Sequence, residues 1–492
     1  MLYKTTLEDF SRFSKKAPRV VVSKEIYGDS LTPVRIFQAL AVDRDDVALL
    51  DSSDHPTSED ACVYIGFDSI AEFSSIGKEV YVREGQNEKH LKEDAHAALR
   101  AFYHRNKCES IHPLAKFAGG MIGFLSYDVV RIFEEIPDRH NNKENIPDML
   151  FKCYGSNIVI DKRTGKVLVT RVVEVTGDDG GDYKAAIVAI DNIIETMISS
   201  KSSLKAVSIS YCDTPPVEVD IDDAGFKKIV NKAKEYIAKG DAFQIVASRR
   251  FQQVYDGDDF NIYRALRVLN PSPYQFFIRH PDFTIVGASP ERLVSLQQGI
   301  IETMPIAGTR PRGENFQIDQ QLEKDLVEDE KENAEHMMLL DLGRNDVGSI
   351  SLPGSVKVVE QAKIHRYSRV MHMVSRVQGQ LDPKYDVFDV VRCCFPAGTL
   401  SGAPKIRAME IIDEIETSKR GVYGGAVVAI DNLGQMDSCI TIRTALLKDG
   451  IATVRAGGGI VLDSDPQKEA DETRHKVQAV LDALALAREG FV

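Results

Sequence analysis

The sequence predicts a globular fold that combines helices with strands, and two observations support this. Of the 492 residues, 43% are hydrophobic and 27% are charged, which is the balance of a chain that buries a core. Segments with the two-residue alternation of strands and segments with the 3.6-residue periodicity of helices occur in both halves. The length allows two or three average domains, or one unusually large domain.

The first half contains few motifs. It is predicted to form strands at 47–50 and 117–127, a hairpin over 159–175 and a helix over 183–198. The first strand ends in Asp51, Ser52 and Ser53, whose oxygens either bind a ligand or close a turn. The chain is polar from 199 to 223, so we place a domain boundary near residue 215. This gives an N-terminal half, 1–215, packed on a C-terminal domain, 216–492.

The second half carries more chemistry. It is predicted to form a helix ending at Gly240, a strand with Gln244, a helix over 319–342, a strand with His372 and a strand over 439–447. A histidine in an apolar strand is more often a core residue than a functional one. Arg443 alternates with apolar neighbours, so its guanidinium needs either a carboxylate ligand or a salt bridge.

The stretch 454–476 organises this half. A strand leads into Gly457, Gly458 and Gly459, which can approach an anion closely, and Pro466 opens a helix. Glu469 and Glu472 share one face of that helix with Lys476, and the earlier helix has the same spacing in Glu332 and Glu335. Such pairs are either solvated faces or two arms of a site for a hard divalent cation.

Charge and cysteine usage exclude several classes of function. The formal net charge of −13 argues against nucleic-acid or anionic-membrane binding. No apolar run reaches transmembrane length and no signal peptide is expected. Seven cysteines without a CxxC pair fit free thiols in a reducing cytoplasm. We therefore expect a cytoplasmic protein.

Seven motifs, in this order, resemble the chorismate-utilising enzymes, and among them the anthranilate synthase component I family. They are SPER, PIAGTR, KENAEH, DLGRND, FPAGTLSGAPK, RAGGG and EADET. They lie within about 225–490, and the first half matches more loosely through ALLDSSD. The resemblance implies an α+β fold, with helices around a large β-sandwich and an active-site cleft in the second half.

The resemblance also implies a reaction and a site. Chorismate takes up ammonia at C2, loses its C4 hydroxyl and then eliminates pyruvate to leave anthranilate, the first committed step of tryptophan biosynthesis. The implied catalytic residues are Glu291 as general acid, His372 as the group near the reacting ring, and Thr399. The implied substrate-binding residues are Gly308, Thr309, Tyr423, Arg443, Gly457, Gly458, Gly459 and Lys476. Mg²⁺ is implied as cofactor, held by Glu335 and Glu472, with Glu332 and Glu469 as outer or water-mediated partners.

Two positions favour ammonia as the nucleophile. Related enzymes that activate water carry a lysine where this chain has Gln244, and an amide is not a base at neutral pH. Aminodeoxychorismate synthases carry a lysine that attacks C2, where this chain has Ala307. No cysteine lies in a glutaminase motif, so the implied partner is a separate glutamine amidotransferase subunit.

Feedback inhibition by tryptophan is a further implication of the resemblance. The inhibitor is expected between two segments that supply Leu50, Ser52, Pro273, Tyr274 and Gln275. Asp51 and Gln275 depart from the family pattern, which favours weaker binding. Two alternatives stay open: aminodeoxychorismate synthase component I, and a catalytically inactive paralogue that binds tryptophan or acts as a scaffold.

Overall fold

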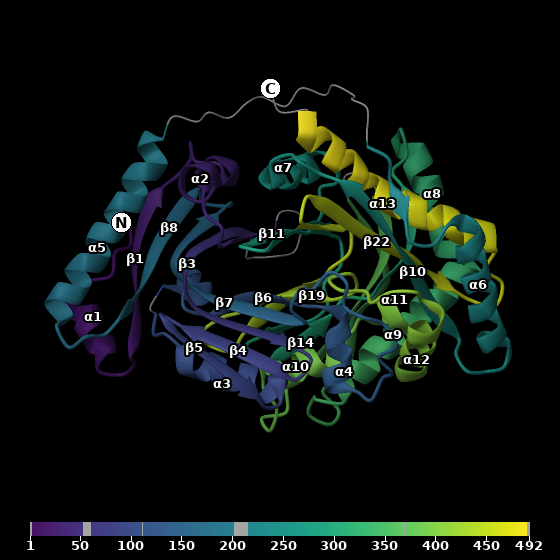
Figure 1. The fold of residues 1–492 in the computed structure, drawn as a ribbon, viewed down its shortest axis with the longest axis horizontal. Coiled ribbons are helices and arrows are strands. Elements are labelled where there is room, and N and C mark those ends of the chain that lie inside the picture. Colours follow the sequence, from purple (N-terminus) through teal and green to yellow (C-terminus); the bar gives the residue numbers. More distant parts are fainter. Residues whose placement is uncertain (1, 53–60, 111, 201–214, 368–369, 490–492) are drawn as a thin grey trace.

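The computed structural model describes residues 2–52, 61–110, 112–200, 215–367 and 370–489. Strands occupy the middle of the molecule and helices cover its outside (Figure 1). The strands before residue 215 are β1 (Arg19–Tyr27), β2 (Val47–Asp51), β3 (Cys62–Ile76), β4 (Glu79–Glu84), β5 (Asn87–Lys92), β6 (Met121–Leu125), β7 (Met149–Asp161) and β8 (Lys166–Glu174). Those after it are β9 (Glu218–Val219), β10 (Gln244–Val254), β11 (Tyr274–His280), β12 (Phe283–Ser289), β13 (Ser295–Gln297), β14 (Ile300–Thr303), β15 (Ile306–Pro311), β16 (Lys357–Arg366), β17 (Val370–Gln380), β18 (Gly402–Ala403), β19 (Ala426–Ile430), β20 (Met436–Ile440), β21 (Thr444–Lys448) and β22 (Ile451–Ile460).

The helices complete the fold. They are α1 (Leu7–Ser14), α2 (Pro33–Leu40), α3 (Ala95–Asn106), α4 (Val130–Phe133), α5 (Asp179–Ser199), α6 (Asp223–Ala238), α7 (Asp259–Leu269), α8 (Phe316–Glu328), α9 (Glu330–Gly348), α10 (Val387–Cys394), α11 (Gly398–Ser401), α12 (Lys405–Ile415) and α13 (Pro466–Glu489), with short 3₁₀ turns at Pro113–Phe117 and Tyr127–Val129. No helix within the described ranges is long and apolar enough to cross a membrane.

The strands form two antiparallel arms that meet at β7. One arm runs β1-β8-β7-β3-β2-β11-β12-β21-β22-β10. The other runs β7-β6-β19-β20-β13-β14-β17-β16. Strand β7 is long enough to serve both arms, because it pairs with β6 near its start and with β8 near its end.

The two arms pack face to face as a sandwich. Phe276 and Ile278 of β11 share one buried cluster with Val427 and Ala429 of β19, and these residues belong to different arms. Phe277 points the other way, into a cluster with α2, α7 and α13. This alternation is the period-2 pattern of a strand buried on both faces. The predicted α+β sandwich flanked by helices is therefore confirmed.

Several predicted elements are confirmed in type and corrected in extent. The hairpin over 159–175 is β7 and β8, and the helix over 183–198 is α5. The strand expected over 117–127 is shortened to β6. The single helix over 319–342 is wrong, since Asp329 separates α8 from α9 and caps α9 by accepting from the backbone N–H groups of Lys331 and Glu332.

Two further corrections concern the second half. The strand expected over 439–447 is broken into β20 and β21, and Arg443 lies between them at a φ of 50°. The glycine triplet continues β22 rather than leaving it, and pairs with residues 246–248 of β10. Residues 53 and 201–214 lie outside the described ranges. The proposed division at 215 borders them and stays a prediction, while β2 pairs with β11 and β6 with β19 across it.

Candidate active site

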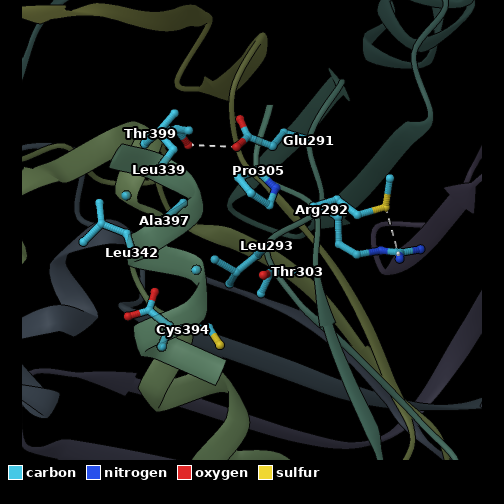
Figure 2. A pocket seen from close by; sticks show the side chains of 14 residues that line it. Glu291, Arg292, Leu293, Thr303, Pro305, Leu339, Leu342, Cys394, Ala397 and Thr399 are labelled. Carbon is cyan, nitrogen blue, oxygen red and sulfur yellow. Dashed lines mark hydrogen bonds between the residues drawn. The ribbon is translucent and has the colours of Figure 1, made fainter. Parts of the chain in front are cut away.

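Glu291 is buried just after β12, and its carboxyl faces α11. The residue is 8% exposed, and its Oε1 accepts a hydrogen bond of 3.0 Å from the Thr399 hydroxyl, which Figure 2 shows. Burial raises the pKa of Glu291 to about 8, although the Thr399 hydrogen bond and the charges of Lys476 and Arg443 oppose this. The side chain is therefore mostly a neutral carboxylic acid at pH 7 and can donate a proton.

His372 lies in β17 directly across from Thr309 of β15. Its Nδ1 is 2.9 Å from the Thr309 hydroxyl, and the residue is 5% exposed. Burial and the nearby charge of Arg443 lower the pKa of His372 to about 4, against a hydrogen bond with the Gly308 backbone. The imidazole is therefore neutral at pH 7, so it can accept a proton.

The glycines of β22 let a helix with two carboxylates approach the strand. A Cβ at Gly458 would lie 2.7 Å from Oε2 of Glu469 and 3.7 Å from the carboxylate of Glu472. Any larger residue would displace Glu469. Lys476, one turn further along α13, donates to the Gly457 carbonyl at 2.9 Å and pairs with Glu472 at 2.6 Å. The predicted common face of Glu469, Glu472 and Lys476, at positions i, i+3 and i+7 of α13, is confirmed.

The two predicted metal arms converge. Burial raises the pKa of Glu335, and the charges of Glu332, Glu469 and Glu472 raise it further, so α9 and α13 bring four carboxylates near one another. Oε2 of Glu469 is buried without a hydrogen-bond partner in the described part of the chain. Hard oxygen donors that repel one another fit a divalent cation such as Mg²⁺. Among the described residues, however, no three histidine, cysteine or acidic side chains already form a coordination shell.

The candidate site also includes two cations, Arg443 and Lys476, and one tyrosine, Tyr423. The guanidinium of Arg443 donates to the Asn270 side-chain oxygen at 3.4 Å, and its charge acts on both Glu291 and His372. Tyr423 is 7% exposed, and the charge of Lys476 acts on its hydroxyl. These two cations could each pair with one carboxylate of a ligand.

Gln244 closes the cleft at the start of β10. A Cβ at Gly459 would lie 2.3 Å from its Nε2, so the amide lies flat against the glycine strand. Its Oε1 is buried and unpaired within the residues that the structure covers. Because this oxygen has no hydrogen-bond donor beside it, it is suited to accept from an N–H group of a ligand. The amide is not suited to activate water.

A second cavity, of about 510 Å³, lies between the two arms of the sandwich. Four of the predicted inhibitor residues line it, Leu50, Ser52, Tyr274 and Gln275, and Pro273 does not. Oε1 of Gln275 is buried there and has no partner among the described side chains. Asp51 also lines it, but its carboxylate is held by Lys162 and accepts from the Tyr263 hydroxyl at 3.0 Å.

Sequence reasoning missed a contact that links the 510 Å³ cavity to the active site. Arg292 follows Glu291 directly, and its Nε donates to the Tyr274 hydroxyl at 2.7 Å. The same guanidinium lies 3.3 Å from Asp437 and 2.7 Å from Glu302. Arg292 stands in the SPER motif directly beside Glu291, and this adjacency was the signal that could have directed attention to it.

Comparisons with known proteins agree with this geometry. A sequence model of the chorismate binding enzyme family matches residues 46–482. Anthranilate synthase component 1 of Acetivibrio thermocellus is 38% identical, over 99% of this chain and 100% of its own. That of Aquifex aeolicus is 43% identical over 76% of each chain.

Solved structures give the same result. Anthranilate synthase component I from Streptococcus pneumoniae is similar with a TM-score of 0.78 and 34% identity, covering 93% of this chain and 98% of that one. The menaquinone-specific isochorismate synthase from Escherichia coli is similar with a TM-score of 0.71 at 18% identity, covering 97% and 98%. The second likeness concerns the fold alone.

Proposed function

The chain belongs to the chorismate-binding enzyme family, and to the anthranilate synthase component 1 proteins within it, and on that premise we propose that it converts chorismate and ammonia to anthranilate and pyruvate. The observation that carries the proposal is that the charge of Arg443 acts on two buried groups, the protonated carboxylic acid of Glu291 and the neutral imidazole of His372. Two titratable groups whose environments move their pKa values apart are suited to act as acid and base.

The acid acts in the first chemical step and the base acts in the second. In the first, ammonia forms a bond to C2 while the C4 hydroxyl leaves, and the Glu291 proton converts that poor leaving group to water. In the second, the C2 proton passes to His372 and the bond to the enolpyruvyl oxygen breaks. The side chain departs as the enolate of pyruvate, whose methylene carbon takes up one proton in place of the one lost from C2, and the ring becomes aromatic. The hydrogen bond from Thr399 orients the Glu291 carboxyl toward its position in the cleft.

The substrate carboxylates are assigned to the cations of the site. Arg443 keeps its charge at every accessible pH and has only an amide oxygen, from Asn270, as its hydrogen-bond partner in the described structure. Lys476 holds its ammonium beside Gly457, with Tyr423 nearby. Gly308 and Thr309 are the remaining residues proposed for the substrate pocket. Gly308 allows a close approach of α8 and α9, because a Cβ there would lie 2.7 Å from Leu326 and 3.2 Å from Glu332.

Mg²⁺ is the proposed cofactor. The residues that would hold it are Glu335 and Glu472, with Glu332 and Glu469 behind them, and the unpaired Oε2 of Glu469 supports this set. When bound, the ion would supply Lewis-acid stabilisation of charge on the ring carboxylate. Apart from any metal, Lys476 offsets part of the carboxylate repulsion through its ion pair with Glu472.

Ammonia is the proposed nucleophile, and a glutamine amidotransferase subunit is its proposed source. Ala307 cannot form the covalent bond to C2 that a lysine forms, and Gln244 cannot deprotonate water. The product would enter tryptophan biosynthesis, and tryptophan would act as inhibitor from the 510 Å³ cavity. A cavity of this size with a few polar groups suits an amino-acid ligand.

One assay tests the central proposal. The purified chain is incubated with chorismate, an ammonium salt and Mg²⁺, and the products are separated. We expect ortho-aminobenzoate and pyruvate in equal amounts. Formation of aminodeoxychorismate would instead support the alternative synthase, and the absence of any chorismate consumption would support the inactive paralogue.

A further inference from the structure

A cavity of about 40 Å³, separate from the 510 Å³ cavity, lies behind the general acid and has no role in the mechanism above. Figure 2 shows Glu291 and Thr399 at one end of it and Cys394 at the other, with Leu293 and Thr303 between. One face of α9 forms a wall, because Leu339, Leu342, Gly343 and Asp346 recur at helical spacing along it.

Polar groups occur along the whole length of this cavity. The hydroxyl of Thr303, a residue that is 7% exposed, is buried and has no hydrogen-bond partner in the described ranges. Glu291 and Thr399 supply the inner end. Asp346 supplies another lining carboxylate, which pairs with Lys405 at 2.7 Å and keeps 14% of its side chain exposed. A buried hydroxyl without a partner costs stability unless water binds it.

The volume also suits water. A cavity needs roughly 10–15 Å³ to hold a water, and the volume of about 40 Å³ exceeds this threshold. A water there would find two or more partners among the Glu291 carboxyl, the Thr303 and Thr399 hydroxyls and the Asp346 carboxylate. A dry cavity would be lined by apolar groups alone.

We propose that this cavity holds a chain of waters that returns a proton to Glu291 after each turnover, with Thr303 as the residue that positions it. The inference rests on the proposed function, since it concerns the same acid. Glu291 is only 8% exposed, and a group that gives up its proton once per cycle needs a supply route. The burial that raises its pKa makes this return favourable.

The route returns to Glu291 the one proton that it loses in each turnover. The Glu291 proton leaves with the C4 oxygen as water, and the carboxylate then takes one proton from the nearest cavity water. Each water in turn takes one from its neighbour, and the last takes one from solvent near Asp346. The ammonia that adds at C2 releases one proton in the same turnover, so no net proton is consumed.

Filling the cavity tests the proposal. Gly343→Ala places a methyl group 3.2 Å from the Thr303 hydroxyl, and its next neighbours are 3.9 and 4.0 Å away. The methyl displaces water, yet alanine in a helix favours folding. Gly348→Ala is the matched control on the same helix, where the nearest atom is Val356 at 3.9 Å outside the cavity. We expect Gly343→Ala to lower kcat about tenfold with an unchanged chorismate KM and a larger solvent isotope effect.

Thr303 gives a second test that does not need activity. If its hydroxyl binds water, Thr303→Val lowers the thermal midpoint and Thr303→Ser does not, whereas a hydroxyl in a dry cavity makes Thr303→Val stabilising. A rise in the midpoint of Thr303→Val, a crystal structure with no water density in the cavity, or an unchanged kcat and isotope effect in Gly343→Ala would each overturn the proposal. A wild-type chain that makes no anthranilate overturns the proposed function itself, while the midpoint and the density still decide hydration.

Discussion

At the scale of single residues, burial acts on an acid and a base in opposite directions. It disfavours the charged form of each, so it raises the pKa of Glu291 and lowers that of His372. Arg443 opposes the first shift and adds to the second, which places its charge within reach of both groups. Neutral forms of both are therefore available together over a wide range of pH.

The pH dependence of turnover follows from these two values. We expect kcat/KM for chorismate, measured with free ammonia held constant, to rise as His372 loses its proton near pH 4. It should fall as Glu291 loses its proton near pH 8.

Thr399→Val removes a hydrogen bond that stabilises the Glu291 carboxylate, so the alkaline limb should move to higher pH. A limb that stays in place or moves down would contradict this assignment. Glu291→Gln should lower kcat by roughly 10²–10⁴.

Choice of nucleophile is also decided at one residue. Gln244→Lys places an amine against the glycine strand, and burial there should lower the pKa of that amine enough for it to deprotonate water. We expect a product carrying hydroxyl at C2 to appear beside anthranilate when ammonia is supplied, and to appear alone when ammonia is omitted, with the products separated by chromatography. Gln244→Met, which has similar volume and no base, is the control. A lysine variant that forms only anthranilate, or nothing, would show that Gln244 is not the determinant.

At the scale of elements, α13 brings one pair of carboxylates to β22, and α9, which packs on β15 and β17, carries the other pair. The strand accepts this crowding because Gly458 has no Cβ to meet Glu469. The repulsion among the four carboxylates is the structural reason that a cation should stabilise the folded state.

Magnesium binding should therefore be visible as stability. A Mg²⁺ concentration of about 100 times its Kd stabilises a protein that binds it only when folded by about 2.7 kcal/mol. We expect the thermal midpoint to rise with Mg²⁺ in the wild type, and this rise to be lost in Glu335→Gln and Glu472→Gln together with turnover. Glu330→Gln removes an exposed carboxylate from the same helix and should behave as the wild type. A full Mg²⁺ response in Glu335→Gln would exclude that carboxylate as a ligand.

The elements also show what the sequence could predict. The start of α13 at Pro466 and the capping role of Asp465 follow from local hydrogen bonding, so pattern alone was sufficient. The break at Asp329 was missed because helical periodicity continues across it, although the residue is a good N-cap. The positive φ of Arg443 was not predictable, since nothing local to that residue type favours it and the surrounding tertiary structure imposes it.

At the scale of the whole molecule, long-range pairing builds both cavities. The 510 Å³ cavity takes Leu50 from β2, Tyr274 from β11 and Cys439 from β20, which lie far apart in sequence. Only the resemblance could bring such residues together in advance, and four of the residues that it named, Leu50, Ser52, Tyr274 and Gln275, line this one cavity. Pro273 is adjacent in sequence but does not line the cavity.

The contact between Tyr274 and Arg292 gives the cavity a route to the active site. A ligand that moves the Tyr274 ring would alter the hydrogen bond to Arg292, the residue next to the general acid. Inhibition requires that the ligand favour a state that binds chorismate poorly, and the coupling must then be reciprocal. Tyr274→Phe keeps the ring and removes the hydrogen bond. We expect this variant to bind tryptophan but to be inhibited less.

The absence of tryptophan from the chain makes the binding directly measurable. Indole emission in a titration comes only from added ligand, so a blue shift and a rise in anisotropy report its burial. Chorismate should displace it, with a coupling of about 1–3 kcal/mol between the two ligands. Ser52→Phe fills the cavity and should abolish both binding and inhibition, whereas Tyr274→Phe should keep the emission change and lose part of the inhibition. Unchanged emission up to millimolar tryptophan would remove the regulatory role of the cavity, and would leave the chemistry of Glu291 and His372 unaffected because their pKa shifts arise within the other site.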